Sequence, residues 1–159
     1  MSERRPLQPA SVREGYLDGG CYHFALALHR LTGLPMVEIG NMSPADTFFG
    51  GHAAIRLPDH SVVDAAGRWT GEAILEEWQA NAILPMVADQ LILDLCGEED
   101  GDGGAKLSGE ALERVILAEA HIRADRDYLE ANLKVLPGPR DCPDGTRVAE
   151  SSGCFPGRR

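Results

Sequence analysis

Residues 52–67 read HAAIRLPDHSVVDAAG, and this stretch predicts the β-hairpin around which the rest of the fold is arranged. Two apolar segments, 52–57 and 61–65, are separated by Pro58-Asp59-His60. Short apolar runs on either side of such a turn sequence are typical of two antiparallel strands joined by a three-residue loop.

The expected register of this hairpin places a histidine beside an aspartate. If Leu57 lies opposite Ser61, then Ala54 faces Asp64, and His52 is the diagonal neighbour of Asp64 on the same face. A carboxylate at that distance can hold one imidazole nitrogen and leave the other nitrogen for a second group. The hairpin therefore predicts a histidine that is oriented by an acid.

A helix expected over 21–31 supplies a third chemical group, because it begins at Cys21. Its apolar residues recur at helical spacing, Gly19-Gly20 precedes it, and Gly33 and Pro35 follow as stop signals. A cysteine at a helix N-terminus lies among unpaired N–H groups and the positive end of the helix dipole, which favour the thiolate. Cys21, His52 and Asp64 are thus candidates for nucleophile, base and orienting acid.

The local sequences around these three residues resemble those of papain/transglutaminase-like cysteine enzymes. The resemblance covers about residues 15–69 and is carried by GCYHFALAL at 20–28, TGLP at 32–35, HAAI at 52–55 and VVDAAG at 62–67. In that superfamily the cysteine opens a helix and the histidine and aspartate lie on successive strands. The resemblance implies an α+β fold in which the nucleophile helix packs on a small antiparallel sheet, followed here by a long C-terminal helix.

The activity that the resemblance implies is cysteine-dependent acyl transfer on an amide of a protein or peptide, without a cofactor. Hydrolysis by a peptidase or amidase, glutamine deamidation and transglutamination are all compatible with it. Relatives often place Gln or Asn shortly before the cysteine as an oxyanion donor, whereas this chain has Tyr16 and Asp18 there. The backbone N–H of Cys21 is one expected donor.

Four further residues are expected to contact substrate because they lie close in sequence to the three candidates. They are Tyr22 and His23 beside the cysteine, Gly51 before the histidine and Trp69 after the aspartate. For Trp69 the alternative is a place at the edge of the core, as for Trp78.

The remaining expectations concern the organisation of the chain. We expect a polar N-terminal arm over 1–14, one domain over 15–136 and an irregular Pro/Gly-rich tail over 137–159. The other expected elements are a strand over 36–39, a loop over 41–51, a helix over 71–81 capped by Thr70, a segment 91–95 that fits strand or helix, an acidic loop over 98–104, and a helix from a Ser108 cap to 134.

Charge and composition exclude several classes of partner. The 159 residues hold 15 Lys and Arg against 25 Asp and Glu, a formal charge of −10, which repels nucleic acid and anionic membranes. The sequence shows no apolar run long enough for a membrane span and no export signal. We expect a soluble, cytoplasmic protein, with export by a signal-independent route and the oligomeric state left open.

Two alternatives compete with an active thiol enzyme, and a third gives the enzyme a different biological context. A zinc site would use Cys21, His23, His29 and His52, although two positions separate Cys21 from His23, about 200° around a helix. A catalytically inactive scaffold would bind a protein partner through Phe48-Phe49 and the acidic loop. A secreted effector with deamidase activity would act on a foreign protein.

Overall fold

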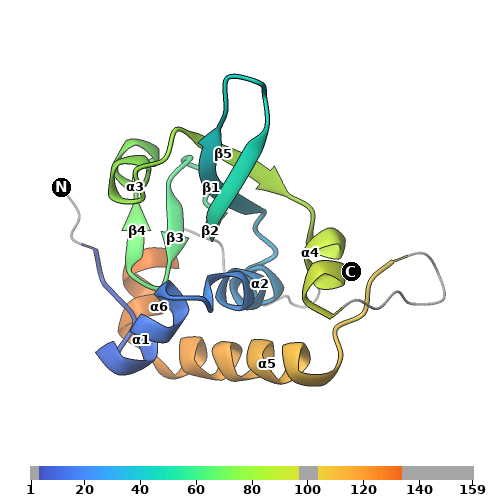
Figure 1. Ribbon diagram of the computed structural model, residues 1–159. Coiled ribbons are helices and arrows are strands. Elements are labelled where there is room, and N and C mark those ends of the chain that lie inside the picture. The colour runs from blue at the N-terminus through green and yellow to red at the C-terminus, as the bar shows by residue number, and fades with distance from the viewer. Residues whose placement is uncertain (1–3, 97–103, 134–159) are drawn as a thin grey trace.

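A five-stranded antiparallel sheet lies at the centre of the computed structural model, which describes residues 4–96 and 104–133. Its strand order is β4-β3-β2-β1-β5 (Figure 1). The strands are β1 (Met36–Met42), β2 (Phe48–Arg56), β3 (Val62–Asp64), β4 (Gly67–Trp69) and β5 (Ala82–Met86). The helices are α1 (Ala10–Leu17), α2 (Cys21–Thr32), α3 (Gly71–Glu77), α4 (Ala88–Cys96), α5 (Gly109–Ala124) and α6 (Arg126–Leu133). The expected α+β class with a small antiparallel sheet is confirmed.

Helix α2, which begins at Cys21, lies between the sheet and α5 (Figure 1). Its buried side, which includes Phe24 and Leu28, packs with Ala53 and Ile55 of β2 and with Val115 of α5 in the larger core cluster. The helix ends where the stop signal predicts, because its cap residue Gly33 has φ +76° and donates its N–H to the His29 carbonyl. Burial on two sides fixes the direction of α2 and therefore the position of its first residue.

The other side of the sheet carries a smaller core cluster beneath α3. Ala54, Val62 and Trp69 of the sheet pack there with Ile74 of α3. The predicted cap of α3 is confirmed, since the Thr70 hydroxyl accepts a hydrogen bond from the Ala73 N–H at 3.1 Å. The helix ends at Glu77, earlier than expected, and Trp78 follows as its C-terminal cap.

The hairpin register deduced from the sequence is confirmed at the pairs Ile55↔Val63 and Arg56↔Val62. Strand β2 is longer than expected, however, because it begins at Phe48 and pairs with a β1 that extends to Met42. The expected loop over 41–51 is therefore wrong for most of its length. The physical reason is the close backbone approach that Gly40 and Gly50 allow, since a Cβ on Gly40 would lie 2.2 Å from the Phe49 carbonyl oxygen.

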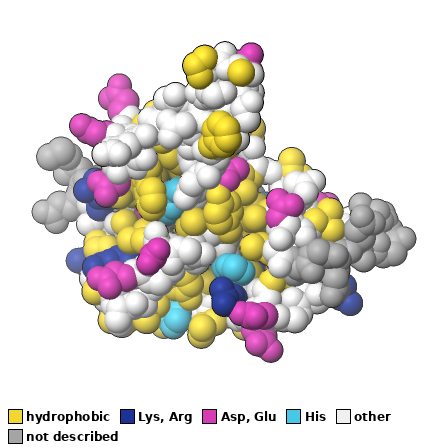
Figure 2. All heavy atoms as spheres, in the orientation of Figure 1, with side chains coloured by type: hydrophobic (Ala, Val, Ile, Leu, Met, Phe, Trp, Pro, Cys, Tyr) yellow, Lys and Arg dark blue, Asp and Glu magenta, His cyan; other side chains and the backbone are white. Residues whose placement is uncertain are grey.

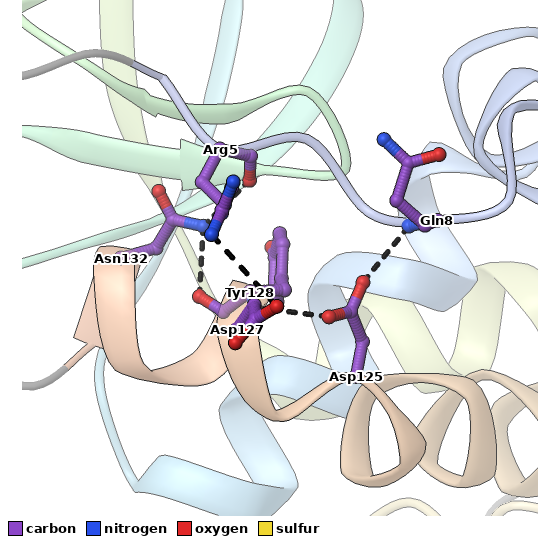
Figure 3. Close-up of polar contacts among 6 residues, drawn as sticks. All are labelled: Arg5, Gln8, Asp125, Asp127, Tyr128 and Asn132. Atoms are coloured by element: carbon purple, nitrogen blue, oxygen red, sulfur yellow. Dashed lines mark hydrogen bonds and ion pairs between the residues drawn. The ribbon is translucent and has the colours of Figure 1, made fainter.

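The long C-terminal helix expected from 108 to 134 is two helices. Asp125 leaves helical geometry, at φ −103° and ψ 85°, and its carboxylate accepts the N–H of Tyr128 at 3.0 Å (Figure 3). An aspartate that accepts the third N–H of a following helix is a typical N-cap. Asp125 therefore ends α5 and starts α6.

The expected polar arm is part of the packed structure. Leu7 is fully buried and donates its N–H to the Ala65 carbonyl at 2.8 Å. The neighbouring Gln8 N–H bonds to the Asp125 carboxylate, and the Asn132 amide donates to the Arg5 carbonyl, each at 2.9 Å (Figure 3). One apolar residue and its backbone contacts thus dock the first residues between β3 and α6.

Other expectations are resolved or lie outside the described residues. Segment 91–95 is helical, within α4, and the edge strand β5 includes Pro85, which an edge position tolerates. The tail over 137–159 and nearly all of the acidic loop lie outside the described residues. Within 4–96 and 104–133, no helix is long and apolar enough to cross a membrane.

Candidate active site

Cys21 is the first residue of α2 and is almost buried, with 6% of its surface exposed. The chain reaches it through a tight turn, in which Gly19 has φ +96° and the Gly20 N–H bonds to the Gly15 carbonyl. A Cβ on Gly20 would lie 2.6 Å from that carbonyl oxygen, so a glycine is required at this close approach. No side chain caps the first turn of α2, which leaves its N–H groups available beside the sulfur.

His52 and Asp64 form a buried pair on one face of the sheet. The His52 Nε2 lies 2.7 Å from the Asp64 Oδ2, and their exposed fractions are 0% and 2%. The register of β2 and β3 produces this contact, because both residues lie on the face that carries Ala54 and Val62. The predicted pairing of the imidazole and the carboxylate is confirmed.

Three groups fix the Asp64 residue behind the histidine. Its Oδ1 accepts hydrogen bonds from the Trp69 indole N–H and the Ala66 backbone N–H, each at 2.9 Å. The hydroxyl of Tyr128, from α6, donates to the Asp64 carbonyl oxygen at 2.7 Å. With Oδ1 occupied in this way, Oδ2 is the oxygen presented to His52.

Trp69 therefore has a different place from the one expected. Its ring is 7% exposed and the Arg4 guanidinium lies 3.8 Å above it. Because its indole N–H is bound to Asp64, we assign it to holding the carboxylate rather than to contacting substrate. The core-edge alternative is the one that the structure supports.

Trp78 covers the His52 imidazole. The two rings stack with centroids 4.0 Å apart and planes 15° from parallel. The sequence indicated only that Trp78 lies at the edge of the core. Its contact with the histidine depends on where α3 ends, which the periodicity alone did not predict.

The free nitrogen of His52 is the one that can act on the thiol. Among the described residues the buried Nδ1 has no hydrogen-bond partner, although Cys21 lies near enough to affect the titration of the ring. Burial lowers the pKa of His52, but the electrostatic interactions of the ring with Asp64 and Cys21 outweigh burial and raise the pKa to about 9. The thiol is therefore beside the imidazole without a completed hydrogen bond, as is common before substrate binds.

Tyr22 points toward a carboxylate that the sequence analysis did not single out. Its hydroxyl donates to the Glu38 Oε2 at 2.5 Å. The Glu38 carboxylate lies against Gly50, where an added Cβ would be 2.0 Å from Oε2. The signal in the sequence was a single acid within the apolar strand sequence from Met36 to Ile39.

Of the residues expected to contact substrate, Gly51 lies beside the candidate site and His23 lies away from it. Gly51 is exposed, and a Cβ added there would meet no atom within 4 Å, so the backbone directly before His52 is open to a substrate. His23 instead lines a hollow of about 240 Å³ between α1, α2 and α5, with Tyr16, Arg114 and His121 among its neighbours. Figure 2 shows basic and histidine side chains gathered on this face over α2 and α5.

The expectation that His23 contacts the same substrate is therefore corrected, because the helix turns its side chain toward α5. The proposed zinc ligands do not converge either. His29 bonds through Nδ1 to the Leu34 carbonyl at 2.7 Å, while His23 lies at the hollow and His52 is bound to Asp64. Within the described part of the chain, no group of three or more His, Cys, Asp or Glu residues is placed to hold a metal ion.

Comparison of the chain with models of known protein families, with curated proteins and with solved structures gave no match.

Proposed function

We propose that this chain is a cysteine-dependent enzyme that transfers the acyl group of an amide, on a papain/transglutaminase-like fold. The observation that carries the proposal is the His52 imidazole, whose Nε2 is held by Asp64 while its Nδ1 has no partner among the described residues, and whose titration Cys21 is close enough to affect. A nucleophile, a base and a group that orients the base are the parts that thiol-dependent acyl transfer requires.

In the first half-reaction, the Cys21 sulfur attacks the amide carbonyl carbon and His52 holds the proton that the thiol releases. The imidazolium then gives that proton to the amide nitrogen, the C–N bond breaks, and an amine leaves a thioester on Cys21. A pKa near 9 keeps this proton on His52 at neutral pH. Asp64 stabilises the imidazolium and fixes its plane.

In the second half-reaction, water or an amine attacks the thioester and His52 takes a proton from the attacking atom. The C–S bond breaks, the thiol is restored and an acid or a new amide is released. Because the single Tyr22 hydroxyl proton is directed at Glu38, this side chain is not an oxyanion donor. The backbone N–H groups at the uncapped start of α2 are the donors that remain nearby.

Labelling by an N-acyl-norleucyl chloromethyl ketone tests the proposal. Alkylation of Cys21 at pH 7, located by peptide mapping because other cysteines are present, should fall by about a hundredfold or more in His52→Ala. Cys21→Ala should not be labelled at this position and provides the blank. A His52→Ala variant that is folded and labelled at the wild-type rate would contradict the mechanism.

A second candidate, an inactive scaffold that binds a protein partner, is favoured by one observation. Phe49 is 63% exposed on the projecting β1–β2 hairpin, and Figure 2 shows hydrophobic side chains at the tip of this hairpin. For such a scaffold, Cys21→Ser should leave the cellular effect of the chain intact and Phe49→Ser should remove it.

For an effector enzyme, expression of the wild type but not of Cys21→Ala should harm the target cell.

A further inference from the structure

Tyr22 and Glu38 lie next to the candidate nucleophile, and together they present only hydrogen-bond acceptors. Tyr22 directly follows Cys21, and its one hydroxyl proton is used in the 2.5 Å bond to the Glu38 Oε2. The phenol oxygen then has only lone pairs to offer. The carboxylate likewise offers acceptor oxygens and a negative charge.

The Glu38 carboxylate has a fixed position beside the histidine strand. Glu38 faces Ala53 across the β1–β2 ladder, next to the pair formed by Ile39 and His52. Its side chain lies over Gly50, with an ideal Cβ position there 2.0 Å from Oε2 and 2.2 Å from Cδ. A Cβ added at the neighbouring Gly51 would meet no atom within 4 Å. A glycine at 50 thus makes room for the carboxylate, and a glycine at 51 leaves room for a ligand.

No ion pair among the described residues neutralises the Glu38 carboxylate. Within residues 4–96 and 104–133, the ion pairs join Arg5, Arg30, Arg68, Arg114 and His52 to other acids, and none includes Glu38. A half-buried carboxylate without a counter-ion is costly unless a bound partner supplies the positive charge. The chemistry that complements two acceptor groups and one negative charge is an N–H donor that is itself cationic.

We propose that Tyr22 and Glu38 form a subsite that binds an alkylammonium or guanidinium group of the substrate. The inference rests on the proposed thiol chemistry, because it places the cation beside the bond that Cys21 attacks. The positive group can belong to the acyl part of the substrate or to the amine that accepts the acyl group. Glu38 is then the residue that selects for charge, and Tyr22 fixes the orientation of its carboxylate.

The first experiment compares two probes that differ only in the terminal ammonium group, the N-acyl-lysyl and N-acyl-norleucyl chloromethyl ketones. At low salt the lysyl probe should label Cys21 about tenfold faster, the effect of roughly one charge-assisted hydrogen bond. The preference should disappear in Glu38→Gln and in Gly50→Ala, whose new methyl group displaces the carboxylate. It should persist in Glu113→Gln, a matched loss of one charge at an exposed position of α5.

The second experiment does not depend on activity. Unlabelled butylammonium is added to ¹⁵N-labelled Cys21→Ala protein, and the amide resonances of Gly50 and Gly51 should shift to saturation. They should not shift with 1-butanol, nor with butylammonium when Glu38→Gln is added to the protein.

The outcomes separate the two proposals. If the lysyl probe labels Cys21 faster and this preference depends on Glu38, the subsite is supported and the cation belongs to the acyl part of the substrate. If both probes label Cys21 at the same rate but butylammonium binds in a Glu38-dependent way, the subsite is supported and the cation belongs to the accepting amine. The subsite is overturned if the two probes label Cys21 equally and butylammonium does not bind, or if the lysyl preference persists in Glu38→Gln. In either case, labelling that depends on His52 still supports the enzyme. Butylammonium binding without His52-dependent labelling by either probe supports the subsite and contradicts the enzyme.

Discussion

His52 is the residue on which the proposed chemistry depends, and its environment combines opposing effects. The ring is fully buried, which disfavours its charged form, yet it contacts a carboxylate at 2.7 Å and lies beside a thiol. A buried imidazolium persists only where such partners compensate for the loss of water. Two predictions concern this charge, and a third concerns the tryptophan that covers the ring.

The first prediction is a direct titration. In ¹⁵N NMR of the reduced protein, the His52 imidazole should titrate with a pKa of about 9. Asp64→Asn removes the charge and one hydrogen-bond acceptor of the charged form, so the pKa should fall in this variant. An unchanged His52 pKa in Asp64→Asn would contradict the proposed role of the pair.

The second prediction follows from the same pKa through its effect on folding. A histidine whose pKa rises from the ordinary 6.5 to about 9 on folding stabilises the native state fully below pH 6.5. This contribution is lost as the pH rises through 9, and it amounts to about 3 kcal/mol. Urea unfolding at a series of pH values measures this loss. As the pH rises through 9, the free energy of unfolding of the wild type should fall by about 3 kcal/mol more than that of His52→Gln. Parallel curves for the two proteins would show that the buried charge is absent.

Trp78 gives the third prediction. Its ring stacks on His52 at 4.0 Å, and Trp78→Ala removes the flat surface that restricts rotation of the imidazole. We expect the chloromethyl-ketone labelling rate of Cys21 to fall about tenfold or more, because small misplacements of a catalytic group have large effects. Trp78→Phe keeps an aromatic face and should stay much closer to the wild-type rate. Equal rates in the Ala and Phe variants would mean that the stacking has no positioning role.

At the scale of elements, the β1–β2 pair brings Glu38 and His52 to the same region by letting two backbones approach closely. The register shifts between Ile39 and Gly40, so that Gly40 pairs with Gly50 and Ile39 with His52. A shift of this kind is a β-bulge, which redirects the side chains on one strand. The glycines around it differ in what surrounds them, and this difference can be tested.

Gly40→Ala should destabilise the fold, whereas Gly51→Ala should not. A Cβ on Gly40 would lie 2.2 Å from the Phe49 carbonyl oxygen and 2.7 Å from the Gly50 Cα, so the backbone would have to move. We expect a loss of about 2 kcal/mol or more in the free energy of unfolding. A Cβ on Gly51 meets nothing within 4 Å, so its substitution should change stability by about 1 kcal/mol or less. Chemical denaturation of both variants measures the difference, and similar losses would contradict the described register.

At the scale of the whole molecule, the two ends of the described chain meet behind the site. The first described residues dock against α6 through Arg5, whose carbonyl accepts a hydrogen bond from the Asn132 amide (Figure 3). The Leu7 N–H donates to the Ala65 carbonyl, and the Tyr128 hydroxyl of α6 donates to the Asp64 carbonyl. The strand that carries the aspartate is only three residues long, so it depends on these long-range contacts. The C-terminal helix therefore supports the site from outside the segment that carries the resemblance.

Tyr128→Phe tests this support. The side chain is fully buried, and removal of its hydroxyl leaves the Asp64 carbonyl without that donor. The free energy of unfolding should fall by about 1–3 kcal/mol. If α6 also positions Asp64, the labelling rate of Cys21 should fall under conditions in which the variant is folded. Asn132→Ala, which removes contacts of α6 that do not involve Asp64, should destabilise the protein without this loss of rate.

The sequence by itself determined the features that depend on local patterns. The hairpin register followed from two short apolar segments on either side of the Pro58-Asp59-His60 turn, and the ends of α2 followed from Gly20, Gly33 and Pro35. These signals act within a few residues, where backbone sterics and cap chemistry leave few choices. Hence the His52–Asp64 contact and the position of Cys21 at a helix start were predictable.

Only the tertiary structure decided which distant groups meet these residues. Trp69 and Tyr128 hold Asp64, Trp78 covers His52, and Glu38 accepts the hydroxyl proton of Tyr22. The Asp125 cap that divides the C-terminal helix and the burial of Leu7 were not predicted, because a single aspartate within a helical pattern and a single leucine within a polar segment give no periodic signal. Such contacts depend on how separately formed elements pack, and packing is selected by the whole core rather than by neighbours in the chain.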